Sequence, residues 1–123
     1  MEYNRDNNFS WKNIQQELEE QREQELETLR DQLQQVQQQI KERKKISERT
    51  VQDLKDSIYD QSQRLEKAEN NPEPDETRVR DRLERLYRDI RNEYSSRWSD
   101  IQDLKREKRE LEKEIKLQER DTA

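Results

Sequence analysis

Apolar residues recur along most of the chain at steps of three and four, in two runs separated by residues 69–78, ENNPEPDETR. Such alternation is typical of a coiled-coil seam, the row of positions through which paired helices face each other. The pattern therefore predicts two long helices. The positions expected to pack in the seam of a hairpin are Leu29, Leu33, Ile40, Val51, Leu54, Ile58, Leu83, Ile90, Trp98, Ile101, Leu104 and Leu111.

Both runs also contain an eleven-residue spacing, between Ile40 and Val51 and between Ile90 and Ile101. An eleven-residue repeat corresponds to about 3.67 residues per turn and relaxes the left-handed supercoil, so nearly straight helices are expected.

Lys44 and Ser47 fill the first of these intervals, and Tyr94 and Trp98 fill the second. In the seam, Lys44, Ser47 and Lys108 are then polar positions that fix register and partner.

The segment between the runs decides between a hairpin and a continuous rod. It contains both prolines of a chain that has no glycine, and Pro74 followed by Asp75 and Glu76 is a favourable helix start. A rod would carry both prolines inside a helix, at a cost of several kcal/mol. In a hairpin, position i faces roughly position 145 − i, so Trp98 falls opposite Ser47, a large side chain against a small one. The hairpin is favoured.

The sequence thus predicts an all-α fold in which two long helices form an antiparallel coiled-coil hairpin, as one coiled-coil domain. Its expected parts are a flexible segment at 1–9, a helix at 10–70, a turn at 71–74, a helix at 75–120 and a tail at 121–123.

The second helix is too short to cover the start of the first. Trp11, Ile14 and Leu18 therefore lack a partner in the same chain and are candidates for self-association. Small helical scaffolds need extra stabilisation, which oligomerisation supplies. We expect two hairpins to form a four-helix homodimer. The alternative is a disordered tail at residues 1–10, with Trp11 packing only on the helix start.

Composition supports elongated helices. Charged residues make up 46% of the 123 residues and hydrophobic ones 25%, against roughly 25% and 45–50% in globular domains. A compact core is therefore excluded. Disorder is disfavoured because 26 basic residues nearly offset 31 acidic ones, and because good helix formers follow a helical period.

No enzymatic chemistry is indicated, and we expect no catalytic residue, cofactor or metal. The chain has no histidine and no cysteine, which removes the usual general base, the commonest metal ligand and any thiol nucleophile. No run approaches the ~18 apolar residues of a membrane span, and the N-terminus does not have the pattern of a signal peptide. A cytoplasmic protein without membrane contact is expected.

Glu73, Asp75 and Glu76 make the predicted tip of the hairpin acidic. An acidic-tipped helical hairpin resembles that of transcription factors which enter the secondary channel of RNA polymerase and present carboxylates to its catalytic magnesium. The resemblance implies a regulator that acts through its tip on a larger machine. The alternative is that these acids stabilise the start of the second helix and keep the turn soluble.

Two further surfaces have alternative interpretations. The basic residues at 41–49 and 78–91 suit nucleic-acid binding, but intervening acids and the net charge of −5 favour a solvated, ion-paired surface. The aromatic residues Tyr59, Tyr87, Tyr94 and Trp98 suit a partner groove, or packing in and beside the seam.

The sequence therefore favours a non-enzymatic interaction or scaffolding module that acts by helix pairing, with a second copy or another helical protein as partner. A tip-acting regulator is the alternative, and nucleic-acid binding is a third reading.

Overall fold

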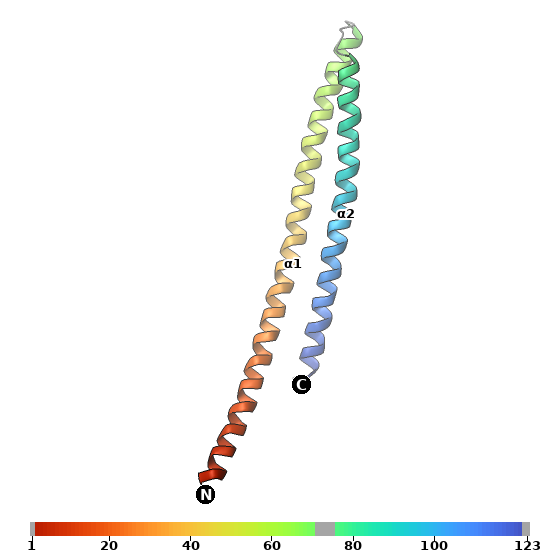
Figure 1. Ribbon diagram of the computed structural model, residues 1–123. Helices are drawn as coiled ribbons and strands as arrows, with labels where there is room; N and C mark the ends of the chain where they lie inside the picture. Colours follow the sequence, from red (N-terminus) through yellow and green to blue (C-terminus); the bar gives the residue numbers. More distant parts are fainter. Residues whose placement is uncertain (1, 71–75, 122–123) are drawn as a thin grey trace. The chain divides into compact units, whose positions relative to one another are not determined.

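The computed structural model is all-α and contains two helices, α1 (Glu2–Asn70) and α2 (Glu76–Asp121), which pack against each other (Figure 1). The structure describes the backbone of residues 2–70 and 76–121 and the side chains of residues 11–67 and 76–121. The prediction of an all-α helical hairpin is confirmed. The predicted turn at 71–74 lies outside the described residues.

Helix α1 begins earlier than the sequence suggested. Residues 2–9, expected to be flexible, are helical. This stretch contains neither glycine nor proline. Once a helix exists, each added residue contributes its own hydrogen bond without a new nucleation cost, so α1 extends to Glu2.

The chain divides into two compact units. Unit 1 consists of Met1–Gln38 with Arg106–Ala123, and unit 2 consists of Gln39–Lys105. In each unit a segment of α1 lies beside a segment of α2 (Figure 1).

The interior of unit 1 is small. Val36 and Ile115 are buried, and they are flanked by half-buried positions at Leu29, Leu33 and Leu111. Arg30 of α1 donates to Glu119 of α2 at 3.1 Å, but both side chains are at least half exposed, so this ion pair contributes about 0–1 kcal/mol. The helices of unit 1 are therefore held mainly by a thin apolar strip.

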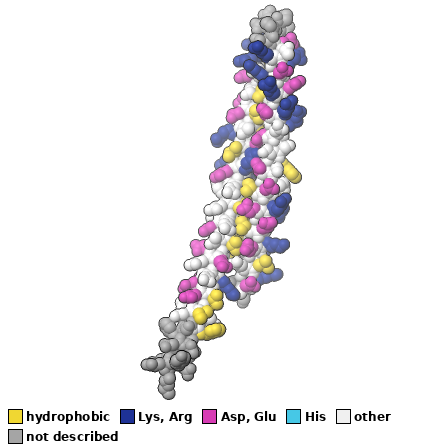
Figure 2. Space-filling model, in the orientation of Figure 1, with side chains coloured by type: hydrophobic (Ala, Val, Ile, Leu, Met, Phe, Trp, Pro, Cys, Tyr) yellow, Lys and Arg dark blue, Asp and Glu magenta, His cyan; other side chains and the backbone are white. Residues whose placement is uncertain are grey.

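Unit 2 has a longer seam. Among its described residues Val51, Val79 and Ile101 are buried, and burial of each such side chain contributes about 1.5–3 kcal/mol. Half-buried apolar positions extend this row at Ile40, Leu54, Ile58, Leu83, Ile90 and Leu104. On the face of the molecule drawn in Figure 2, hydrophobic side chains form small, separate patches between charged ones.

Candidate interaction surfaces

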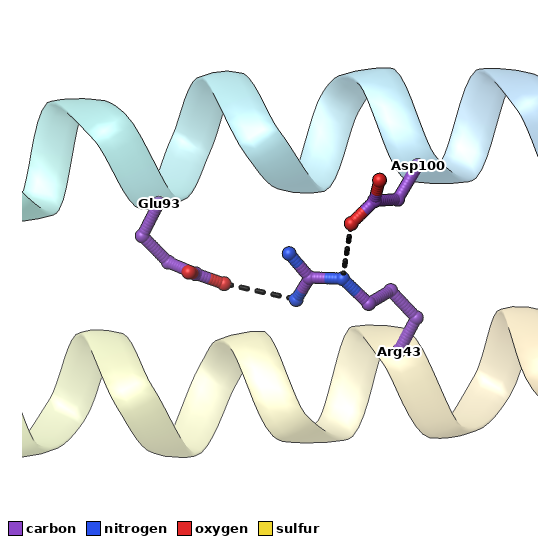
Figure 3. Close-up of polar contacts among 3 residues, drawn as sticks. All are labelled: Arg43, Glu93 and Asp100. Carbon is purple, nitrogen blue, oxygen red and sulfur yellow. Dashed lines mark hydrogen bonds and ion pairs between the residues drawn. The ribbon is translucent and has the colours of Figure 1, made fainter.

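Unit 2 contains, near its limits at Gln39 and Lys105, a polar layer that links the two helices. Arg43 Nη1 donates to Glu93 Oε1 at 2.9 Å, and Arg43 Nε donates to Asp100 Oδ2 at 3.0 Å (Figure 3). The Arg43 and Glu93 side chains are only 19% and 18% exposed, whereas Asp100 is 51% exposed. Hydrogen bonding to Glu93, and then to Asp100, raises the pKa of Arg43 above its ordinary value. The guanidinium is therefore a fixed positive charge beside the seam.

Arg43 and Glu93 were not predicted as seam residues. Steps of three and four continue past Ile40 to Arg43 and Ser47, and past Ile90 to Glu93 and Arg97, all of which are buried or half-buried. Extending the alternation regardless of polarity would have found them. The predicted seam instead passed through the nearby residues Lys44 and Trp98.

The placement of Trp98 in the seam was wrong. Its side chain is 68% exposed, and Tyr94 is also exposed. The half-buried position is Arg97. Adjacent residues on an α-helix differ by about 100° in direction, so a seam that passes through position 97 turns position 98 away from α1. Lys44 is likewise exposed, and Arg43 takes its place.

Ser47 occupies the seam as predicted and is fully buried, at 0% exposure. Its Oγ has no hydrogen-bond partner within the described residues. A buried hydroxyl without a partner costs free energy, about 1–3 kcal/mol. Ser47 therefore supplies a small volume in the seam, and its hydroxyl adds no hydrogen bond to the part of the chain that the structure describes.

Every aromatic side chain that the structure describes is exposed: Trp11, Tyr59, Tyr87, Tyr94 and Trp98. Tyr59 Oη accepts a hydrogen bond from Gln63 at 3.0 Å. On α2, steps of seven and four relate Tyr87, Tyr94 and Trp98, so these three side chains share one side of the helix. The seam of the described chain is thus built without aromatic residues, and the interpretation of this set as core packing is not supported.

A shallow groove runs along that side of unit 2. It is lined by Tyr94, Trp98 and the buried Ile101, with Gln102 and the cations Lys44, Arg97 and Lys105. None of the three cations has an ion pair within the described chain, and no acidic residue lines the groove. We call these seven residues the aromatic–basic groove.

The start of α1 carries a second exposed apolar row. All side chains from residue 11 to 25 are exposed, and they include Trp11, Ile14 and Leu18. We call this stretch the N-terminal segment. It contains five glutamates against Lys12 and Arg22, which gives a net charge of −3. It is an acidic helix whose apolar row has no partner within the described part of the chain.

Only part of the predicted acidic tip can be located. Glu73 and Asp75 lie outside the described residues. Glu76 is half-buried at the start of α2, and its Oε1 accepts hydrogen bonds from Arg80, at 3.0 Å from Nη2 and 3.4 Å from Nε. The Glu76 carboxylate therefore serves the first turn of α2.

Among the described residues, no group of three or more acidic, histidine or cysteine side chains is arranged to hold a metal ion. In the same part of the chain, neither helix has a stretch that is long and apolar enough to cross a membrane.

A family model matches the whole chain, residues 1–123, and its description is "Family of unknown function (DUF8104)". The chain belongs to this family. No curated protein and no solved structure matches it.

Proposed function

We propose that this member of the DUF8104 family is a non-enzymatic interaction module that acts by helix pairing and associates with a second copy of itself. The observation that carries the proposal is the N-terminal segment. Its apolar row continues the helical period of α1, yet Trp11 is 63% exposed, Ile14 46% and Leu18 53%. A row of large apolar side chains on a helix is the feature through which helices pair.

The magnitudes favour a reversible dimer. Complete burial of a large apolar side chain contributes about 1.5–3 kcal/mol. Trp11, Ile14 and Leu18 are each about half exposed, so burial of these six side chains in two N-terminal segments contributes on the order of 4–9 kcal/mol to association. Association itself costs about 4–15 kcal/mol in lost freedom of motion. We therefore expect a dimer that dissociates on dilution, and whose affinity depends on further contacts.

Sedimentation equilibrium over a wide concentration range tests the proposal. The wild-type chain should change from the monomer mass of 15.4 kDa to twice that mass as concentration rises. The triple variant Trp11→Ala, Ile14→Ala, Leu18→Ala should remain monomeric over the range in which the wild type dimerises. Alanine preserves helix propensity, and circular dichroism should confirm that the helices are intact.

Leu117→Ala is the control. Leu117 is 56% exposed on α2, outside the N-terminal segment, so its loss removes a comparable exposed side chain. It should leave the dissociation constant unchanged. A wild-type chain that stays monomeric at every concentration, or a triple variant that dimerises normally, would rule out the proposed function.

A further inference from the structure

Building on the proposed function, we infer that the N-terminal segment of one copy docks in the aromatic–basic groove of a second copy. The proposed function requires only that the N-terminal segment mediates self-association. The inference assigns the surface that receives it, through apolar contacts with Tyr94 and Trp98 and charge pairing with Lys44, Arg97 and Lys105.

The groove has the composition of an interface hot spot. Trp, Tyr and Arg are the residue types that most often carry binding energy. Here Trp98 and Tyr94 stand exposed at its side, and Ile101, only 7% exposed, forms an apolar floor. The chain is poor in apolar residues, and Trp98 lies outside the seam. Its indole therefore becomes buried only through contact with a partner.

The charges of the two surfaces are opposite. The groove contributes three positive charges and no negative one, whereas the N-terminal segment has a net charge of −3. Glu17 and Glu19 flank Leu18 in the sequence, so carboxylates accompany the apolar row. Complementary charge of this kind fixes register and increases the rate of encounter.

A second groove in unit 2 argues for the specificity of this match. It is lined by Gln39, Glu42, Arg43, Ile46, Asp100, Asp103 and Leu104. Its only cation, Arg43, is bonded to Glu93 and Asp100. The remaining charges are acidic and would repel the N-terminal segment, although Ile46 offers an exposed apolar contact.

The spacing of the two surfaces is compatible with helix-in-groove binding. Trp11, Ile14 and Leu18 are separated by three and four residues, the spacing of anchors on a docked helix. Tyr94 and Trp98 are four residues apart, one turn of α2. Each copy contributes one N-terminal segment and one aromatic–basic groove. A two-fold dimer therefore contains the contact twice, and neither of these two surfaces remains unoccupied.

Cysteine cross-linking tests the contact directly, because the natural chain contains no cysteine. One chain carries Gln15→Cys, beside the apolar row, and a differently tagged chain carries Gln102→Cys, in the aromatic–basic groove. Mixed under oxidising conditions, the two should form a disulfide-linked heterodimer. Gln39→Cys is the control. It replaces a glutamine in the second groove of unit 2, where the N-terminal segment is not expected to bind, so it should not cross-link to the Gln15→Cys chain.

Charge reversal supplies a second test. Lys44→Glu with Lys105→Glu should raise the dissociation constant at least tenfold, the ratio that corresponds to 1.4 kcal/mol. Mixing this variant with a Glu17→Lys, Glu19→Lys chain should restore association between the two. Arg64→Glu with Arg85→Glu changes the net charge of unit 2 equally outside the groove, and should have a much smaller effect.

These outcomes separate the inference from the proposed function. If the alanine triple variant loses dimerisation but both charge-reversed pairs behave alike and Gln39→Cys cross-links as well as Gln102→Cys, self-association stands and the groove assignment is wrong. If the wild-type chain never dimerises, the proposed function fails, and the groove assignment fails with it.

Discussion

Arg43 and Glu93, fifty residues apart in the chain, form a 2.9 Å ion pair in which both side chains are less than a fifth exposed. The pair lies at positions where the three-four alternation of both helices would otherwise place apolar residues. Arg43 reaches a second carboxylate at Asp100, two helical turns further along α2. Because a shifted register would leave these charges partly buried and unpaired, the layer favours one alignment of α1 with α2 in unit 2.

The Arg43–Glu93 pair should therefore show a measurable coupling energy. In a double-mutant cycle with Arg43→Gln and Glu93→Gln, we expect about 1–2 kcal/mol of coupling, because hydrogen bonds to charged groups in partly buried sites exceed the net value of exposed pairs. Urea unfolding of the four proteins measures it. To keep self-association out of the measurement, the cycle is built on the chain carrying alanine at positions 11, 14 and 18.

The parallel cycle between Arg43 and Asp100 is the comparison. Asp100 is half exposed, so its coupling should be smaller, about 0.5 kcal/mol. Equal coupling for both carboxylates, or none for Glu93, would contradict the burial seen in the structure.

The overall fold followed from the sequence because its signals agreed: period, helix propensity and a single proline-containing break. The register was also close. Position 43 was expected to face position 102, and position 30 to face position 115; the observed bonds reach Asp100 and Glu119, each within about one helical turn.

The polar layer was not predicted, for a specific physical reason. Between Ile40 and Val51, and between Ile90 and Ile101, eleven residues make three turns, and the two inner seam positions can be chosen in more than one way. Hydrophobicity selected Tyr94 and Trp98. The structure instead places Glu93 and Arg97 at these two seam positions. Which residues occupy them depends on the side chains they meet on α1, and on whether an indole fits between closely packed helices.

Ser47→Ala should stabilise the hairpin. The Ser47 hydroxyl is fully buried and has no hydrogen-bond partner within the described chain. Alanine removes the free-energy cost of burying this hydroxyl away from water, and it leaves no large cavity. We expect the free energy of unfolding to rise by about 1 kcal/mol, measured by urea denaturation on the same alanine background. Alanine also has the better helix propensity, which adds to the gain.

Ser95→Ala separates these two contributions. Ser95 is exposed on α2, so its substitution reports the propensity gain alone. A Ser47→Ala variant that gains no more than Ser95→Ala would show that the buried hydroxyl costs nothing in the native state.

Ile101→Ala should be among the most damaging single substitutions in unit 2. Ile101 is buried in the seam and forms the floor of the aromatic–basic groove. Truncation of a buried isoleucine costs about 2–5 kcal/mol, and we expect the lower part of this range because a narrow seam readily admits water. Ile46→Ala is the control: Ile46 is 57% exposed, and its loss should cost less than about 0.5 kcal/mol.

Trp98→Ala should separate folding from association, since the two depend on different faces of the same helix. Because Trp98 is exposed, its removal from the monomeric chain should change the free energy of unfolding by no more than about 0.5 kcal/mol. In the chain with its native N-terminal segment, the same substitution should weaken dimerisation, since an exposed indole in the groove gains its burial from the second copy. Urea unfolding and sedimentation equilibrium give the two values. A destabilised monomer with unchanged dimerisation would show that Trp98 packs in the seam. A variant that resembles wild type in both assays would show that Trp98 is not part of the dimer interface.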